Sequence, residues 1–172
     1  LFARDAPFGA KSQLETGEGS EYHALRDFQA GMDPRTVDWR RSARHGMLLA
    51  TGHLGRDEIF AVVDAAREKG VQEIVITHPE FPSQDLSVED QKALVEHGAL
   101  LERCFTTPHT GKIAWEEWIA HIREAGPEHS VLSTDLGQVF NPPAEDGMGI
   151  MVDRLLAAGF NDGEIKGMEV TT

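Results

Sequence analysis

The sequence has only one cysteine, Cys104, in 172 residues, so an internal disulfide framework is excluded. A lone thiol is typical of a reducing compartment, and we therefore expect a cytoplasmic location. No apolar run approaches the roughly 18 residues that span a bilayer. The N-terminus also lacks the basic stretch and apolar stretch of a signal peptide. We expect no association with a membrane.

Basic residues are scarce, with 16 Lys and Arg against 29 Asp and Glu, and the net charge is −13. Such a charge argues against binding to nucleic-acid phosphates. Residues 1–46 hold seven basic and seven acidic residues, so the acidic excess falls entirely in residues 47–172. This uneven distribution predicts two segments of different origin.

Residues 1–46 are polar and interrupted by glycine and proline, so we expect a largely irregular segment with a short extended piece near 22–28. From Met47 onward, short apolar runs typical of buried strands alternate with segments whose apolar residues recur at helical spacing. The predicted strands are 47–51, 74–77, 100–105 and 130–134. The predicted helices are 56–69, about 87–97, 113–125, about 147–158 and 162–168.

Four strands that alternate with helices predict an α/β fold with a parallel sheet. Four such βα units form half of an eight-stranded (β/α) barrel, that is, half of a TIM barrel. A free-standing open sheet of four strands is the alternative.

Three side chains that can bind metal follow predicted strands, namely His53, His78 and Asp135. The carboxyl ends of parallel strands meet at one edge, where the sites of βα folds lie. A single histidine at a strand end is more often a hydrogen-bonded loop residue than a ligand. Two histidines and an aspartate at equivalent strand ends favour a divalent metal site, and we expect Zn²⁺ or Mn²⁺ there. Such a metal would activate a water, and Asp135 could also act as its general base.

Other polar residues follow the same strands and are candidates for substrate binding: Glu80, His109, Gln138 and Asn141. Cys104 is better interpreted as a small buried apolar side chain than as a nucleophile. His97, His121 and His129 fall on helices or helix ends, and we expect them at the surface.

Three motifs carry a resemblance to a known family. They are Thr51-Gly52-His53-Leu54, Ile76-Thr77-His78-Pro79-Glu80-Phe81-Pro82, and Ser133-Thr134-Asp135-Leu136-Gly137-Gln138 with Asn141-Pro142-Pro143. Residues 47–172 resemble the C-terminal half of an amidohydrolase-like TIM-barrel family, DUF6282. The resemblance implies a metal-dependent hydrolase fold whose metal is held by strand-end His and Asp. Two features depart from the family pattern. The Asp/His-x-His motif of a first barrel strand is absent, and the third predicted strand has no histidine near Arg103, where the family pattern leads us to expect one.

The N-terminal segment resembles a different family. Gly17-Glu18-Gly19-Ser20-Glu21-Tyr22-His23-Ala24-Leu25-Arg26-Asp27-Phe28, Gly31-Met32-Asp33-Pro34-Arg35 and Val37-Asp38-Trp39-Arg40-Arg41-Ser42-Ala43-Arg44 are similar to the signature of DUF58 proteins, which accompany MoxR-type AAA ATPases. The resemblance covers about residues 1–50, and the Asp-x-Ser-x-Ser motif that should follow is missing. Together the two resemblances describe a chimera with its junction near residues 48–50.

These patterns predict a partial metal-dependent hydrolase with a small-molecule substrate. One alternative is a non-catalytic module that docks a partner of the DUF58 and MoxR kind, and another is a fusion fragment without a function. Because half of a barrel leaves two strand edges unpaired, we also expect that a homodimer could cover them.

Overall fold

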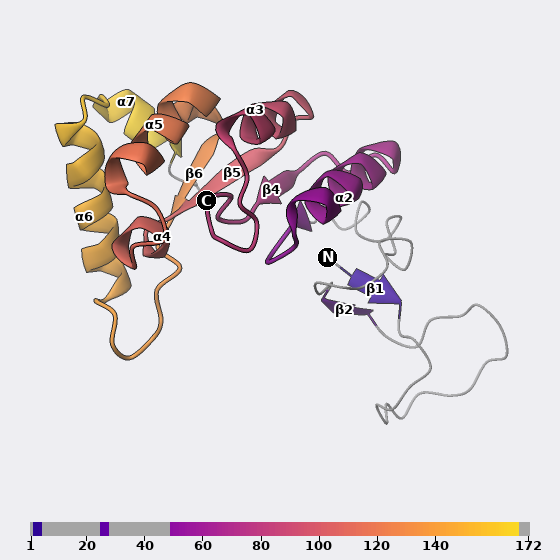
Figure 1. Ribbon diagram of the computed structural model, residues 1–172, viewed down its shortest axis with the longest axis horizontal. Helices are drawn as coiled ribbons and strands as arrows, with labels where there is room; N and C mark the ends of the chain where they lie inside the picture. The colour runs from indigo at the N-terminus through magenta and orange to yellow at the C-terminus, as the bar shows by residue number, and fades with distance from the viewer. Residues whose placement is uncertain (1, 5–24, 28–48, 169–172) are drawn as a thin grey trace, which may run out of the picture.

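The computed structural model describes residues 2–4, 25–27 and 49–168. In the last of these ranges the chain forms a four-stranded parallel sheet with the strand order β3-β4-β5-β6 (Figure 1). The strands are β3 (Leu49–Ala50), β4 (Ile74–Ile76), β5 (Leu100–Cys104) and β6 (Ser130–Ser133). The sheet is open, and the prediction of an α/β fold with a parallel sheet is confirmed.

The strands alternate with helices, as predicted. The helices are α2 (Arg56–Glu68), α3 (Val88–Glu96), α4 (Thr106–His109), α5 (Trp115–Ala125), α6 (Ala144–Ala157) and α7 (Asp162–Met168), with a short 3-10 helix η2 (Pro127–His129). None of the helices in the described ranges combines the length and the apolar character needed to cross a membrane.

Two short strands are described in the N-terminal segment, β1 (Phe2–Arg4) and β2 (Leu25–Asp27), and they pair antiparallel. The extended piece predicted near 22–28 is therefore confirmed at β2. A strand at β1 was not expected, because the surrounding residues carry no strand pattern. The remainder of the predicted DUF58-like segment lies outside the described residues.

Local sequence explains where the first helices begin. At α2 the Glu58 carboxylate accepts a hydrogen bond from Gly55 N at 3.0 Å, and at α3 Ser87 Oγ accepts one from Asp90 N at 3.1 Å. Both contacts satisfy backbone donors that a helix start leaves free. The inward face of α2 carries apolar residues at helical spacing, which are Ile59, Val62, Val63 and Ala66.

Within residues 49–168, the helices that pack on the sheet cover one face of it, the face that carries Leu101 and Leu132. In-register pairing places Ile76 beside Leu101 on this face, and both are buried against helices. The opposite face pairs Val75 with Leu100, and Leu100 remains 37% exposed. A doubly wound sheet would be covered on both faces, whereas a (β/α) barrel carries helices on its outer face only. The one-sided helix cover seen in residues 49–168 therefore matches the half-barrel prediction.

Candidate functional site

After each of three strands, one residue adopts a left-handed backbone conformation. φ is +60° at Gly52 after β3, 29° at His78 after β4 and 51° at Asp135 after β6. A residue with a side chain adopts this region at a cost of about 1–3 kcal/mol, and such residues gather at functional sites. Two of the three predicted metal ligands thus carry backbone strain at the carboxyl edge of the sheet.

Reciprocal hydrogen bonds hold the ends of β3 and β4 together. Thr77 N donates to Thr51 Oγ1 at 3.1 Å, and Gly52 N donates to Thr77 Oγ1 at 3.2 Å. Gln84 Nε2 adds a bond to the Gly52 carbonyl at 2.8 Å. These bonds fix the two loops in register, so that the residues that follow each strand emerge side by side.

His53 and His78 consequently lie in contact, with ring centroids 4.4 Å apart. Phe81 packs against both rings, at 5.4 Å from His53 and 4.9 Å from His78. His53 is exposed, and its Nδ1 lies 3.4 Å from Ser83 Oγ. His78 is 2% exposed, and its Nδ1 has no hydrogen-bond partner among the described residues. A buried ring nitrogen without a partner is costly, by about 1–3 kcal/mol.

Burial lowers the pKa of His78 below its ordinary value of 6.5. The neighbouring His53 lowers this pKa further, while the carboxylates of Asp135 and Glu102 raise it. The ring of His78 is therefore neutral near pH 7, and the neutral imidazole is the form that coordinates a metal.

Asp135 is exposed at the end of β6, and its Oδ2 accepts a hydrogen bond from Thr106 Oγ1 at 2.8 Å. Thr106 is the first residue of α4, and its backbone N donates to the Thr134 carbonyl at 3.3 Å. Across the described part of the chain, no three His, Cys, Asp or Glu side chains converge closely enough to hold a metal ion. The structure thus brings two predicted ligands into contact and leaves Asp135 farther away on the same edge.

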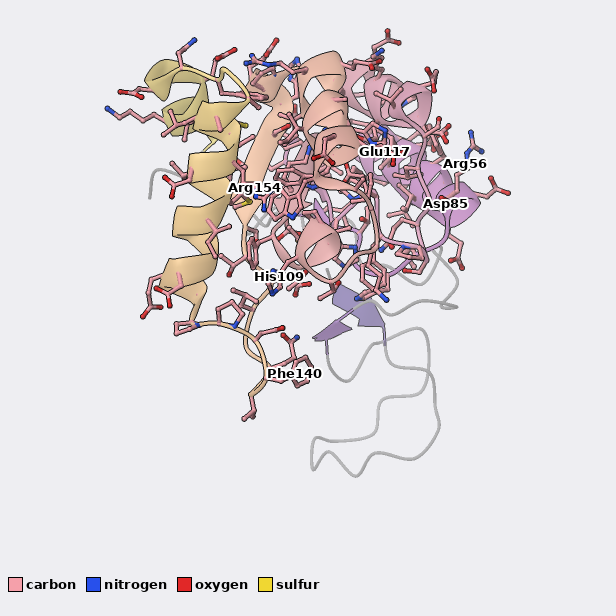
Figure 2. The ribbon with its side chains drawn as sticks, turned by 60° about the vertical axis from the view of Figure 1, so that its left-hand side comes forward. Arg56, Asp85, His109, Glu117, Phe140 and Arg154 are labelled. Atoms are coloured by element: carbon pink, nitrogen blue, oxygen red, sulfur yellow. The ribbon has the colours of Figure 1, made fainter. Side chains whose placement is uncertain are left out.

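The residues predicted to bind substrate are divided between two environments. His109 ends α4 as an exposed ring stacked on Phe105, with centroids 4.6 Å apart. Asn141 Nδ2 donates to Gln138 Oε1 at 2.6 Å in the loop after β6, whose tip carries the exposed Phe140 (Figure 2). These three side chains follow strand ends and remain near the predicted edge.

Glu80, by contrast, points into the interior beneath the helices. Its side chain is 1% exposed and pairs with Arg103, which is fully buried. Arg103 also donates to Gln91 Oε1 at 2.7 Å and to Ser130 Oγ at 3.2 Å. Burial lowers the pKa of Arg103, and the Glu80 carboxylate opposes that effect. This network was not predicted, although an arginine between apolar strand residues was a signal that a buried partner must exist.

Four further predictions concern Cys104 and the three histidines His97, His121 and His129. Cys104 is 1% exposed and burial raises the pKa of its thiol, so its predicted role as a small buried side chain is confirmed. The surface assignment of His121 is wrong, because its side chain is 17% exposed and its Nδ1 lies 3.8 Å from Glu80 Oε1. Two other histidines placed at the surface, His97 and His129, are exposed and partly exposed.

The fold and this edge define an α/β protein with an open four-stranded parallel sheet and a pair of histidines at its strand ends. Residues 40–102 match a family described as "Family of unknown function (DUF6282)". The match supports the resemblance to DUF6282 over residues 40–102 and says nothing of an amidohydrolase-like character or of DUF58. It includes His53, His78 and Glu80, while the third motif with Asp135 lies beyond it. Neither the curated proteins nor the solved structures include a match to this chain.

Proposed function

We propose that His53 and His78 bind a divalent metal ion, zinc or manganese, and that the chain is part of a metal-dependent hydrolase of the amidohydrolase kind. The observation that carries the proposal is the contact of two imidazoles from neighbouring strand ends, 4.4 Å apart. Imidazole is a preferred ligand of zinc and of other divalent transition metals.

The donor chemistry fits this assignment. His78 offers a neutral ring whose Nδ1 has no partner among the described residues, while His53 is exposed and free to adjust. Phe81 packs on both rings and shields the inner one from water. A metal bound here would supply a coordinated water of lowered pKa, the nucleophile of metal-dependent hydrolysis.

In this proposal Asp135 accepts the proton of the attacking water, since the described structure does not bring it to the two imidazoles as a third ligand. Its orientation is fixed by the hydrogen bond from Thr106. His109, Gln138 and Asn141 would contact a small-molecule substrate, since they follow strands on the same edge. The alternative of a docking module rests on residues 1–46, of which the structure describes only β1 and β2.

Thermal unfolding of the full chain with and without Zn²⁺ or Mn²⁺ tests the proposal. A ligand at 100 times its Kd stabilises the folded state by about 2.7 kcal/mol, which corresponds to a rise in Tm of roughly 5 °C or more. The exposed position of His53 makes His53→Ala a mild change to the fold, and it should abolish the rise. His97→Ala, an exposed histidine at the end of α3, should retain it. The absence of a metal-linked shift, or an equal shift in both variants, contradicts the proposal.

A further inference from the structure

Basic side chains are scarce at the edge of the sheet where His53 and His78 lie. Within residues 49–168, the connections from the strand ends to the first turns of the next helices contain two of them, Arg56 and Lys112. The guanidinium of Arg56 is bound by Asp90, with Nη2 2.5 Å from Oδ1. Lys112 is exposed and forms no ion pair with a carboxylate of the described residues. Its charge is therefore available to a ligand.

Hydrogen bonds hold the backbone of Lys112 in the connection that follows β5. Lys112 N donates to the Thr107 carbonyl at 3.0 Å, and Gly111 N donates to the Pro108 carbonyl at 3.1 Å. Gly111 has a φ of +72°, a conformation that glycine adopts without strain, so the chain turns sharply after α4. These contacts fix the point from which the Lys112 side chain leaves the backbone.

The ammonium group of Lys112 lies over the ring of Phe81, which belongs to the connection after β4. Nζ is 5.8 Å from the centre of that ring. Phe81 N donates to the His78 carbonyl at 2.9 Å, which ties the ring to the end of β4. The same ring packs against His53 at 5.4 Å and against His78 at 4.9 Å. Lys112, Phe81 and the two histidines thus form one continuous cluster, drawn from the ends of three neighbouring strands.

A lysine over an aromatic ring is often only surface packing, because the long side chain keeps its apolar stem on an apolar surface. The surroundings of Lys112 favour a further role. Asp85 and Glu117 border the same hollow in the surface as Lys112, yet no carboxylate of the described residues lies within ion-pairing distance of Nζ. The ammonium group lies instead over the ring that His53 and His78 contact.

We infer that Lys112 determines specificity by binding an anionic group of the substrate, a carboxylate. An ammonium group donates up to three hydrogen bonds, and those to a carboxylate are charge-assisted. The net charge of the chain is −13, so an anionic substrate needs a local cation to offset the repulsion. The substrate class is thus a small molecule with a free carboxylate remote from the bond that is hydrolysed. The inference rests on the proposed metal-dependent hydrolysis at His53 and His78.

Isothermal titration of the full chain, loaded with one equivalent of Zn²⁺, tests the inference. The probes are glutarate, adipate and suberate, each compared with its own monoamide, which has the same length but only one carboxylate. The series of lengths lets one carboxylate meet the zinc while the other reaches Lys112. At least one dicarboxylate should bind about two- to fivefold more tightly than its monoamide, the range of an exposed ion pair. Equal affinity for dicarboxylate and monoamide at every length overturns the inference.

Two surface lysines offer matched variants. Lys112→Gln removes the charge and keeps most of the side-chain stem beside Phe81. Lys92→Gln removes an equal charge on α3, where Lys92 pairs with Glu124 at 3.1 Å. The preference for the dicarboxylate should disappear in Lys112→Gln and persist in Lys92→Gln. A preference that Lys112→Gln keeps, or that both variants lose, overturns the inference.

Thermal unfolding separates this inference from the proposed function. Lys112→Gln should retain the zinc-linked rise in Tm, because the changed group is exposed and is not a proposed metal ligand. Loss of that rise would assign Lys112 to the support of the histidine pair and overturn its role toward the substrate. A zinc-linked rise without a preference that depends on Lys112 overturns the inference alone. If zinc does not stabilise the parent chain, the proposed function and the inference fall together.

Discussion

Replacing Arg103 by methionine should be among the most damaging single changes in the sheet. The guanidinium is fully buried, and it donates to Glu80, Gln91 and Ser130. Methionine fills much of the same space but leaves the Glu80 carboxylate buried without its counter-charge. Removing one partner of a buried ion pair typically costs about 3–5 kcal/mol. Since domains of this size are stable by about 5–15 kcal/mol, the variant should lose a large share of its stability.

Urea unfolding followed by tryptophan fluorescence measures this loss, because Trp118 is fully buried and reports on the core. Lys92→Met is the matched control. Its partner Glu124 lies 3.1 Å away in an exposed pair, so its loss should cost at most about 1 kcal/mol.

A second variant separates the lost charge from the lost packing. Combining Arg103→Met with Glu80→Gln removes the uncompensated carboxylate and should recover roughly 2 kcal/mol or more. A cost for Arg103→Met as small as that of Lys92→Met, or a double variant less stable than the single one, would refute the reasoning.

Three further predictions concern packing, reactivity and pH. On α6, a Cβ at Gly147 would meet Leu136 and lie 3.1 Å from Phe105, whereas Gly149 has open space around it. Gly149→Ala should therefore raise the free energy of unfolding by about 1 kcal/mol. Gly147→Ala should be about 1–3 kcal/mol less stable than Gly149→Ala in urea unfolding. The buried Cys104, whose thiol has a raised pKa, should react with a thiol reagent only after denaturation. Folding lowers the pKa of His78, so the unfolded chain binds this proton more readily than the folded chain. The unfolding free energy in EDTA should therefore fall as the pH is lowered from about 7.5 to about 5.5. The fall should be smaller in His78→Gln.

Each of these has a contradicting result. Equal effects of alanine at the two glycines would mean that α6 does not approach Phe105 closely. Rapid labelling of Cys104 under native conditions would mean that β5 is open to solvent. The same pH dependence in the parent chain and in His78→Gln would assign the titration to other groups.

The fold was predictable because its signals are local. Apolar runs that end at His53, His78 and Asp135 located the strand ends, and glycines such as Gly70 and Gly98 marked helix ends through positive φ. Helix α6 begins at Ala144, earlier than predicted, because Pro143 fits the start of a helix and apolar spacing appears only later. The short helix α4 was missed because four residues show no periodicity.

The site was predictable only in part, because side-chain contacts across the sheet are not local. The sequence placed the two histidines on one edge, but their contact depends on the hydrogen bonds that Thr77 makes with Thr51 and Gly52, 26 and 25 residues away. Glu80 was assigned to the edge by its position after β4, yet Arg103, 23 residues later, holds it in the interior. Strand alternation turns Arg103 toward the helices, and only the packed structure identifies the carboxylate that meets it there.

The central claim is that His53 and His78 together bind a divalent metal, and the imidazole ¹⁵N NMR spectrum of the full chain during a titration with Mn²⁺ tests it most directly. Paramagnetic Mn²⁺ at substoichiometric amounts should broaden the ring signals of His53 and His78 first, while those of His97 and His129, on helix ends away from this edge, remain sharp. Uniform broadening of all these rings, or broadening that spares the His53 and His78 pair, would contradict the claim.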